Sequence, residues 1–184
     1  GTKTLPATLR IAGDFTNNGT IDALSNSSTV TIEDDGHDQT IDGSGTSTFY
    51  NLTINNVGKL VTAASSFNVN HILTVNSTLD MGTYSIGGTT SSISGTGTLE
   101  TQSTSANSLP SGLTWTMPVI YKGTDAQSAP AGTYNNLTID NSTGVTLGQA
   151  TIGTLLLTGG SKLTTSGTST ATNVTLEYSV ANGP

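Results

Sequence analysis

The sequence predicts an all-β protein, and within that class a parallel β-helix, or β-solenoid. The chain has 184 residues, of which only 9% are charged, and it is rich in Thr, Ser, Asn and Gly. Threonine favours strands, whereas glycine and asparagine favour turns. Strand-like segments recur about every 20 residues, the length of one solenoid coil, and each coil buries its apolar face only by stacking on its neighbours. No segment shows sustained helical periodicity.

One segment occurs twice and divides the chain into two related halves. Asn51-Leu52-Thr53-Ile54 returns 85 positions later as Asn136-Leu137-Thr138-Ile139. Alternation places Leu52, Ile54, Leu137 and Ile139 on the core face, and Thr53 and Thr138 on the outer face. We expect one elongated solenoid over residues 1–184, with halves of roughly 1–100 and 101–184. A β-sandwich, or two of them, also has short strands with turn signals and is the alternative fold.

The first half can be divided in chain order by its turn signals. Asn18-Gly19 marks a tight turn between Phe15 and Ile21. An acidic turn at residues 33–38 and a glycine turn at residues 43–45 separate later strands. The Gly-, Ser- and Thr-rich segment 86–98 keeps apolar residues at strand spacing, so we expect thin strands there. The expected first-half strands lie around residues 4–11, 29–32, 48–54, 67–75 and 79.

The second half begins with a linker expected at residues 101–112. The alternating strand 113–121 follows, with its apolar residues on one face, and Pro118 within it indicates a bulge or an edge. Later strands are expected around residues 133–139, 152–157, 163 and 174–180. The apolar residues of the alternating strand are Leu113, Trp115, Met117, Val119 and Tyr121.

Composition limits the partners. The absence of cysteine excludes a disulfide scaffold and a thiolate metal site. The net charge is −7 and the five basic residues are spread singly, so no basic stripe suits nucleic acid or an anionic membrane. No run approaches the roughly 18 apolar residues of a membrane helix. We therefore expect no nucleic-acid partner and no membrane insertion.

One cluster of acidic residues could bind calcium, because hard cations prefer several oxygen ligands on a turn. Its spacing is not that of an EF-hand loop, and the repeat of calcium β-rolls is absent. We therefore interpret it as a solvated acidic turn, and we predict no metal site and no cofactor. The cluster comprises Glu33, Asp34, Asp35, His37, Asp38 and Asp42.

No residue pattern predicts catalysis. His37 and His71 are the only histidines, and no Gly-x-Ser-x-Gly elbow accompanies them. His71 lies in a strand-like segment, where a structural role is expected. Polysaccharide lyases and hydrolases also use parallel β-helices, but Arg10 is the only arginine, and paired acids are missing outside residues 33–42. We predict that the chain is not an enzyme and has no catalytic residues.

Several sequence features that could indicate binding have structural explanations. Trp115 and Tyr121 could stack on a sugar, but five same-face apolar residues favour a place in the core. The Thr-x-Thr units are too irregular for an ice-binding array. Asn51 and Asn136 hold equivalent places, which suggests a buried asparagine ladder. Seven Asn-x-Ser/Thr sequons are expected by chance in this composition, at Asn18, Asn26, Asn51, Asn76, Asn136, Asn141 and Asn173.

Three stretches resemble repeats of very large secreted prokaryotic surface proteins of the adhesin-like type. They are GDFTNNGTI (13–21), GTSTFYNLTINN (45–56) and PAGTYNNLTIDNSTGVTLG (130–148). The resemblance covers most of residues 13–166 and implies a right-handed parallel β-helix at the cell surface. Such proteins share no catalytic residues, so none is transferred. The resemblance implies a non-catalytic extracellular structural protein: a stalk, an adhesin segment or a filament subunit. The alternative is a carbohydrate-binding or carbohydrate-cleaving β-helix.

The ends of the chain predict association. Residues 4–11 and 174–180 are apolar strands without a capping helix or a charge cluster, and such edges pair with other chains. We expect end-to-end self-association through the terminal strands, or contact with neighbouring modules of a longer chain. Surface glycans are a further class of ligand that the alternative function would require.

Overall fold

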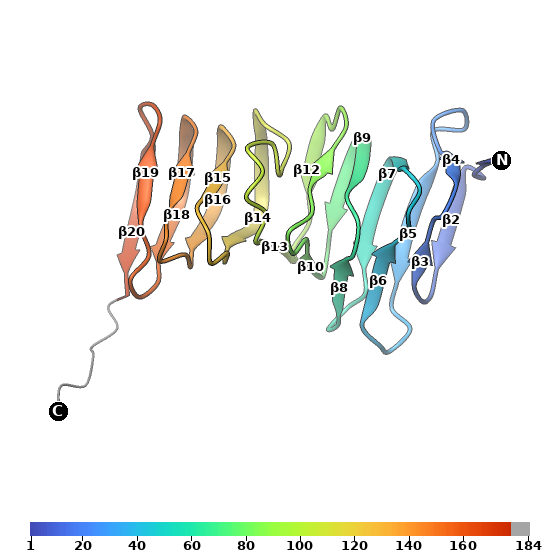
Figure 1. The fold of residues 1–184 in the computed structure, drawn as a ribbon, viewed down its shortest axis with the longest axis horizontal. Coiled ribbons are helices and arrows are strands. Elements are labelled where there is room, and N and C mark those ends of the chain that lie inside the picture. Colours follow the sequence, from blue (N-terminus) through green and yellow to red (C-terminus); the bar gives the residue numbers. More distant parts are fainter. Residues whose placement is uncertain (178–184) are drawn as a thin grey trace.

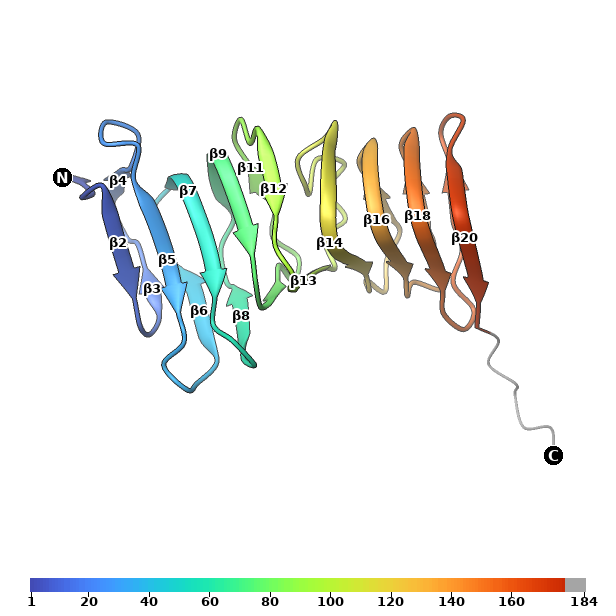
Figure 2. The same cartoon turned by 180° about the vertical axis from the view of Figure 1, so that it is seen from behind.

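The computed structural model describes residues 1–177, and these contain strands and turns but no helix. All of their strand pairings are parallel, so the fold is a β-solenoid of about nine turns and the sandwich alternative is wrong (Figures 1 and 2). The strands are β1 (Thr2–Thr4), β2 (Thr8–Ile11), β3 (Phe15–Thr16), β4 (Thr20–Asp22), β5 (Thr29–Glu33), β6 (Gln39–Asp42), β7 (Ser47–Asn55), β8 (Leu60–Ala63), β9 (Phe67–Val75), β10 (Thr78–Asp80), β11 (Ile86–Gly87), β12 (Ser92–Ser94), β13 (Thr98–Thr101), β14 (Leu113–Tyr121), β15 (Gln127–Ala129), β16 (Gly132–Ile139), β17 (Val145–Leu147), β18 (Ala150–Leu157), β19 (Leu163–Thr165) and β20 (Thr170–Leu176).

Stacked apolar columns hold the coils together. Leu52 pairs with Val30 in the coil before it and with Leu73 in the coil after it. In the second half, Leu137 pairs with Val119 and Leu155. The four core residues predicted from the repeat are at most 1% exposed, whereas Thr53 and Thr138 are half-buried on the outer side, so the predicted faces are confirmed.

The two copies of the repeat lie in different sheets. In the first half the long strands, such as β7, belong to a six-stranded sheet, and the short strands β3, β6, β8, β10 and β13 belong to a nine-stranded sheet. In the second half the long strands, such as β16, join the nine-stranded sheet, and the short strands form a three-stranded sheet. The change occurs where the short strand β13 pairs with the second part of the long strand β14, at Leu99↔Val119. The repeated segment therefore lies on a different side of the coil in each half.

The predicted linker is part of the coil wall. Ser103, Ser108 and Leu109 are buried, and the Ile86 amide donates to the Ser108 carbonyl at 2.9 Å. The segment therefore stacks on β11 as part of the coil. Its serine-rich sequence belongs to a packed turn and not to a flexible linker. The bulge predicted at Pro118 is present, since the register of β14 shifts between Trp115 and Pro118. The thin strands predicted in residues 86–98 correspond to β11 and β12.

The terminal strands are partly as predicted. The first apolar segment forms β1 and β2, with Pro6 between them. The last strand is β20, which ends at Leu176, and residues 178–180 of the predicted terminal strand lie outside the described residues. Within residues 1–177, no helix is long and apolar enough to cross a membrane.

Candidate functional site

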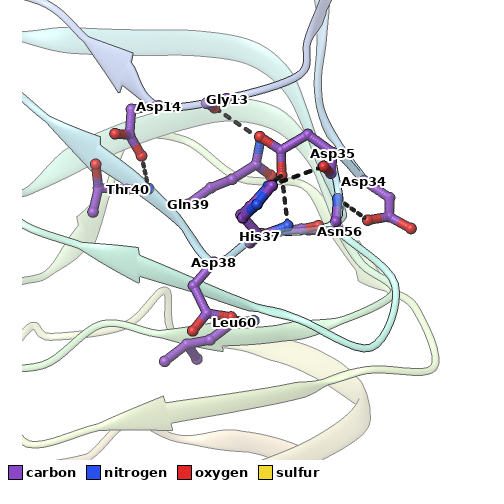
Figure 3. A network of polar contacts seen from close by, with 11 residues as sticks. Gly13, Asp14, Asp34, Asp35, His37, Asp38, Gln39, Thr40, Asn56 and Leu60 are labelled. Atoms are coloured by element: carbon purple, nitrogen blue, oxygen red, sulfur yellow. Dashed lines mark hydrogen bonds and ion pairs between the residues drawn. The ribbon is translucent and has the colours of Figure 1, made fainter.

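The acidic loop 34–38 joins β5 to β6 and uses its carboxylates to bind backbone amides (Figure 3). Asp34 Oδ1 accepts from the Gly36 amide at 2.8 Å, and Asp35 Oδ1 accepts from the His37 amide at 2.9 Å. Asp38 Oδ1 accepts from the Leu60 amide of the next coil at 2.9 Å. These short polar side chains stabilise the turn locally and connect it to its neighbour.

Of the other members of the predicted acidic cluster, Glu33 and Asp42 lie outside these hydrogen bonds, and the His37 side chain lies on the exposed surface of the loop. Glu33 forms an ion pair with Arg10 of the preceding coil. Asp42 is exposed at the end of β6. The His37 side chain is 84% exposed, with Nδ1 3.9 Å from Asp35 Oδ1. Within residues 1–177, no three His, Asp or Glu side chains gather closely enough to hold a metal ion by themselves.

Two buried amide side chains lie beneath the loop. Gln39 is 1% exposed and donates through Nε2 to the Gly13 carbonyl at 2.9 Å. Asn56 is fully buried and donates through Nδ2 to the His37 carbonyl at 2.7 Å. Both side chains therefore fasten the loop to adjacent coils, and Figure 3 draws them at the base of the loop.

An open polar groove of about 570 Å³ begins at Asp38 and crosses the corner before β8, β10 and β13. At the turn before β13, a Cβ added to Gly97 would lie 2.1 Å from the Ser77 carbonyl oxygen, so glycine allows the close approach of these two coils. Hydroxyl, carboxylate and amine groups line the groove, without an aromatic side chain. The lining residues that carry these groups are Asp38, Lys59, Ser77, Thr78, Thr98 and Glu100.

Beside this groove, three charged side chains form the most protected ion pairs of the described residues. Lys122 Nζ lies 2.9 Å from Asp80 Oδ2 and also pairs with Glu100. Partial burial lowers the pKa of Lys122, but the hydrogen bonds to Glu100 and Asp80 outweigh it, so the pKa is raised overall. Sequence reasoning missed this cluster, although the spacing of about 20 residues between its members is the coil length.

The remaining predicted residues are structural. His71 lies in β9, stacks on Tyr50 with ring centroids 4.7 Å apart, and has its Nδ1 3.0 Å from Asn51 Oδ1. Trp115 and Tyr121 are fully buried, which confirms their place in the core. Burial raises the pKa of Tyr121 well above its usual value.

The asparagine ladder predicted at Asn51 and Asn136 is wrong in part. Asn51 donates to Thr29 Oγ1 at 3.1 Å, but it is only half-buried, and Asn136 is exposed. The buried asparagines stand at corners instead, because a corner leaves backbone groups that a side-chain amide can satisfy. They are Asn17, Asn56 and Asn141.

Comparison of the chain with protein-family models, with curated proteins and with solved structures returned no match. The fold and the polar features described above are therefore the basis for a functional interpretation.

Proposed function

We propose that the protein is a non-catalytic extracellular structural protein, a stalk, adhesin segment or filament subunit, that extends by end-to-end stacking of solenoid coils. The observation that carries the proposal is that parallel sheets end in open strand edges at both ends of the stack. Within residues 1–177, β2 and β3 have no strand on their outer side, and neither do β19 and β20. Unpaired edges of this kind accept a strand from another chain.

The polarity of the strands supports head-to-tail contact. Because every coil runs in the same direction, the last coil of one copy can pair in parallel with the first coil of the next. Apolar surface is available at both ends: Val174 and Leu176 of β20 are 56% and 51% exposed, and Leu9 and Ile11 of β2 are half-buried. A contact between two different ends does not close on itself, so it produces filaments rather than rings.

The same contact can join neighbouring modules of one longer chain. A solenoid coil is stabilised by the coil on either side of it, so open terminal coils gain stability from whichever coil follows. The location at the cell surface rests on the resemblance to secreted prokaryotic surface proteins. Length and stiffness would then be the useful properties, with about nine coils of about 4.8 Å giving a rod of about 40 Å.

The second candidate, a carbohydrate-binding β-helix, is favoured by the polar groove that begins at Asp38. Its hydroxyl and carboxylate groups can hydrogen-bond to sugars. It lacks the aromatic platform that usually accompanies such sites, which makes it the weaker proposal. Titration with neutral and acidic polysaccharides, with reducing ends followed over time, separates binding from cleavage and would overturn the non-catalytic proposal if turnover occurred.

The stacking proposal is tested by light scattering and electron microscopy over a range of protein concentrations. We expect the mass to rise with concentration and the rods to have lengths that are multiples of one unit. Leu176→Lys, which places a charge on the apolar edge, should reduce association. Thr175→Lys is the matched control, since it adds the same charge to the same strand on the opposite face. A strictly monomeric protein at high concentration would contradict self-association.

A further inference from the structure

Two buried oxygen atoms beneath the acidic loop have no hydrogen-bond donor. Gln39 Oε1 and Asn56 Oδ1 are both unpartnered, although their residues are at most 1% exposed. A buried acceptor without a donor is unfavourable, and native structures contain few such groups. Because both groups are acceptors, each requires a hydrogen-bond donor or a cation.

Exchange of the amide oxygen and nitrogen does not remove the problem. Gln39 Nε2 already donates to the Gly13 carbonyl, and Asn56 Nδ2 donates to the His37 carbonyl. A flipped amide would point its oxygen at a carbonyl oxygen, which replaces one unpaired acceptor with a repulsive contact. The orientation of both side chains is thus fixed by their donors, and their oxygens remain available.

The second half of the chain contains the same corner in a complete form. Gln127 follows the end of β14 by six residues, as Gln39 follows the end of β5. Gln127 Oε1 accepts from the Gly123 amide at 2.8 Å and from Asn141 Nδ2 at 2.9 Å. Asn141 Oδ1 accepts from the Thr143 and Gly144 amides. All four oxygen contacts are missing in the first half.

The residue at the position of Gly123 differs between the two corners. A Cβ at Gly123 would lie 2.7 Å from Gln127 Oε1, so glycine lets the Gln127 side chain approach this amide without a shift. The first-half loop has Asp35 at the corresponding place, four residues before the glutamine. Where one corner provides a backbone N–H, the other therefore provides a carboxylate.

The carboxylate of Asp35 lies near Gly13, the residue whose carbonyl accepts from Gln39. The Asp35 side chain is 25% exposed, although the loop around it is open to solvent. A Cβ built on Gly13 would lie 4.0 Å from Asp35 Oδ2. Figure 3 draws Asp35, Gln39 and Asn56 together with the hydrogen bonds of the loop. The Asp35 carboxylate in the same corner as two unpaired acceptor oxygens favours a bound cation.

We propose that this corner binds one calcium ion, with Gln39 Oε1, Asn56 Oδ1 and the Asp35 carboxylate as protein ligands and water completing the coordination. Calcium accepts amide, carbonyl and carboxylate oxygens in flexible geometry, whereas magnesium requires a stricter octahedron. A single carboxylate gives a low ligand charge, so the dissociation constant should lie at about 10⁻⁴ to 10⁻³ M. The Gln127–Asn141 corner has its oxygens satisfied and binds no ion.

Isothermal titration of the full chain with calcium chloride, at constant ionic strength, tests the proposal. We expect one site per chain, little or no heat from magnesium chloride, and a higher melting temperature in calcium. Asp35→Asn should weaken calcium binding at least about tenfold, because it removes the ligand charge yet keeps an oxygen that can accept from the His37 amide.

Asp34→Asn is the matched control. It makes the same change in charge one residue away, in an exposed side chain that binds only the Gly36 amide. Its effect on calcium affinity should be less than about threefold, as for the loss of a distant screened charge. Circular dichroism shows whether both variants remain folded. Absence of calcium binding at about 10 mM would overturn the site and leave a buried water as the donor. Equal weakening by the two variants would also overturn it, because that result indicates diffuse attraction to the acidic loop.

Discussion

The two halves of the solenoid build the same coil in different orientations. Leu52 and Leu137 occupy the same place in the repeated sequence, yet one lies in the six-stranded sheet and the other in the nine-stranded sheet. Stacking is preserved across the change, because a parallel strand edge accepts any parallel strand of suitable register. This difference shows that the repeat determines the shape of a coil, a long bent strand followed by a short one. It does not determine the orientation of that coil about the solenoid axis.

The halves also fill their cores differently. In the first half, Phe49 packs between Phe15 and Phe67 with centroid separations of 5.4 and 5.8 Å, tilted against the first ring and edge-on to the second. In the second half, Trp115 and Tyr134 stack at 6.2 Å, and the Tyr134 hydroxyl donates to the Pro130 carbonyl at 2.8 Å. The aromatic residues that pack together in the first core have no ionisable group, whereas the second core contains the buried tyrosines Tyr121 and Tyr134.

Replacement of a core leucine should have the largest effect and tests whether the halves unfold separately. Leu52→Asp places an unpaired charge in a fully buried site, and we expect a loss of about 5 kcal/mol or more. Because each coil contacts only its neighbours, the coils around β7 should unfold first. Leu137→Asp should produce the same loss around β16. Urea denaturation with amide exchange resolved along the chain measures both effects.

Thr53→Asp and Thr138→Asp are the controls, since these side chains lie on the outer face of the same strands. They should change stability by no more than about 1 kcal/mol. An unchanged melting curve for Leu52→Asp would show that the assigned core face is wrong. Simultaneous loss of protection in both halves would show that the solenoid unfolds as one unit.

Alkaline pH should destabilise the second half of the solenoid more than the first half. Burial raises the pKa of Tyr121 and of Tyr134, whereas tyrosines in the unfolded chain ionise near pH 10. The tyrosines do not alter stability below pH 10, because they are protonated in both states. Above pH 10 the tyrosines of the unfolded state lose their protons before those of the folded state. The free energy of unfolding should therefore fall by up to about 1.4 kcal/mol per pH unit for each tyrosine. Amide exchange from pH 9 to 12 should show faster opening of β14–β16 than of β7–β9.

Tyr134→Phe keeps the ring and removes one of the two ionisable groups, so the pH slope of the second half should be roughly halved. The phenylalanine core of the first half provides the internal reference. A slope that is unchanged in Tyr134→Phe, or is equal in both halves, would show that other groups cause the alkaline loss.

Alternation and composition were enough to predict the class of fold and the faces of its strands. Val119 and Tyr121 follow the same alternation as Leu52 and Ile54, and all four are buried. The displacement of the repeat was not predictable, because a strand of the second half carries the same pattern whichever sheet it joins. The segment 101–112 was interpreted as a linker because its serines resemble a flexible connection, although Ser108 makes a ladder-like bond to Ile86.

The polar corners were only partly predictable. The acidic loop is visible in the sequence, and Gln39 and Gln127 precede the two copies of the repeat at similar distances. Burial of these amides depends on which carbonyls the neighbouring coil presents, and this information is distributed over residues about 20 positions apart. The same separation hid the cluster of Asp80, Glu100 and Lys122.

The smallest expected effect concerns this charged cluster, which spans the place where the strand pattern changes. Asp80 and Glu100 are paired residues of β10 and β13, so their carboxylates lie on adjacent coils. Lys122 follows the end of β14 and pairs with both of them. The lysine thus offsets the repulsion between two like charges and connects the first coil of the second half to the last coils of the first.

Lys122→Met keeps most of the aliphatic side chain and removes the charge, so the loss should come mainly from the unpaired carboxylates. Because Lys122 is 28% exposed and the carboxylates are 15% and 23% exposed, solvent weakens the interaction and we expect a loss of only about 1 kcal/mol. Lys162→Met is the control, since Lys162 forms no ion pair within residues 1–177, and it should have almost no effect. The difference between the two variants should shrink in about 1 M salt, where charges are screened within a few ångströms. If Lys122→Met proves as stable as the control at low salt, the junction between the halves depends on its β13–β14 ladder and not on this charge.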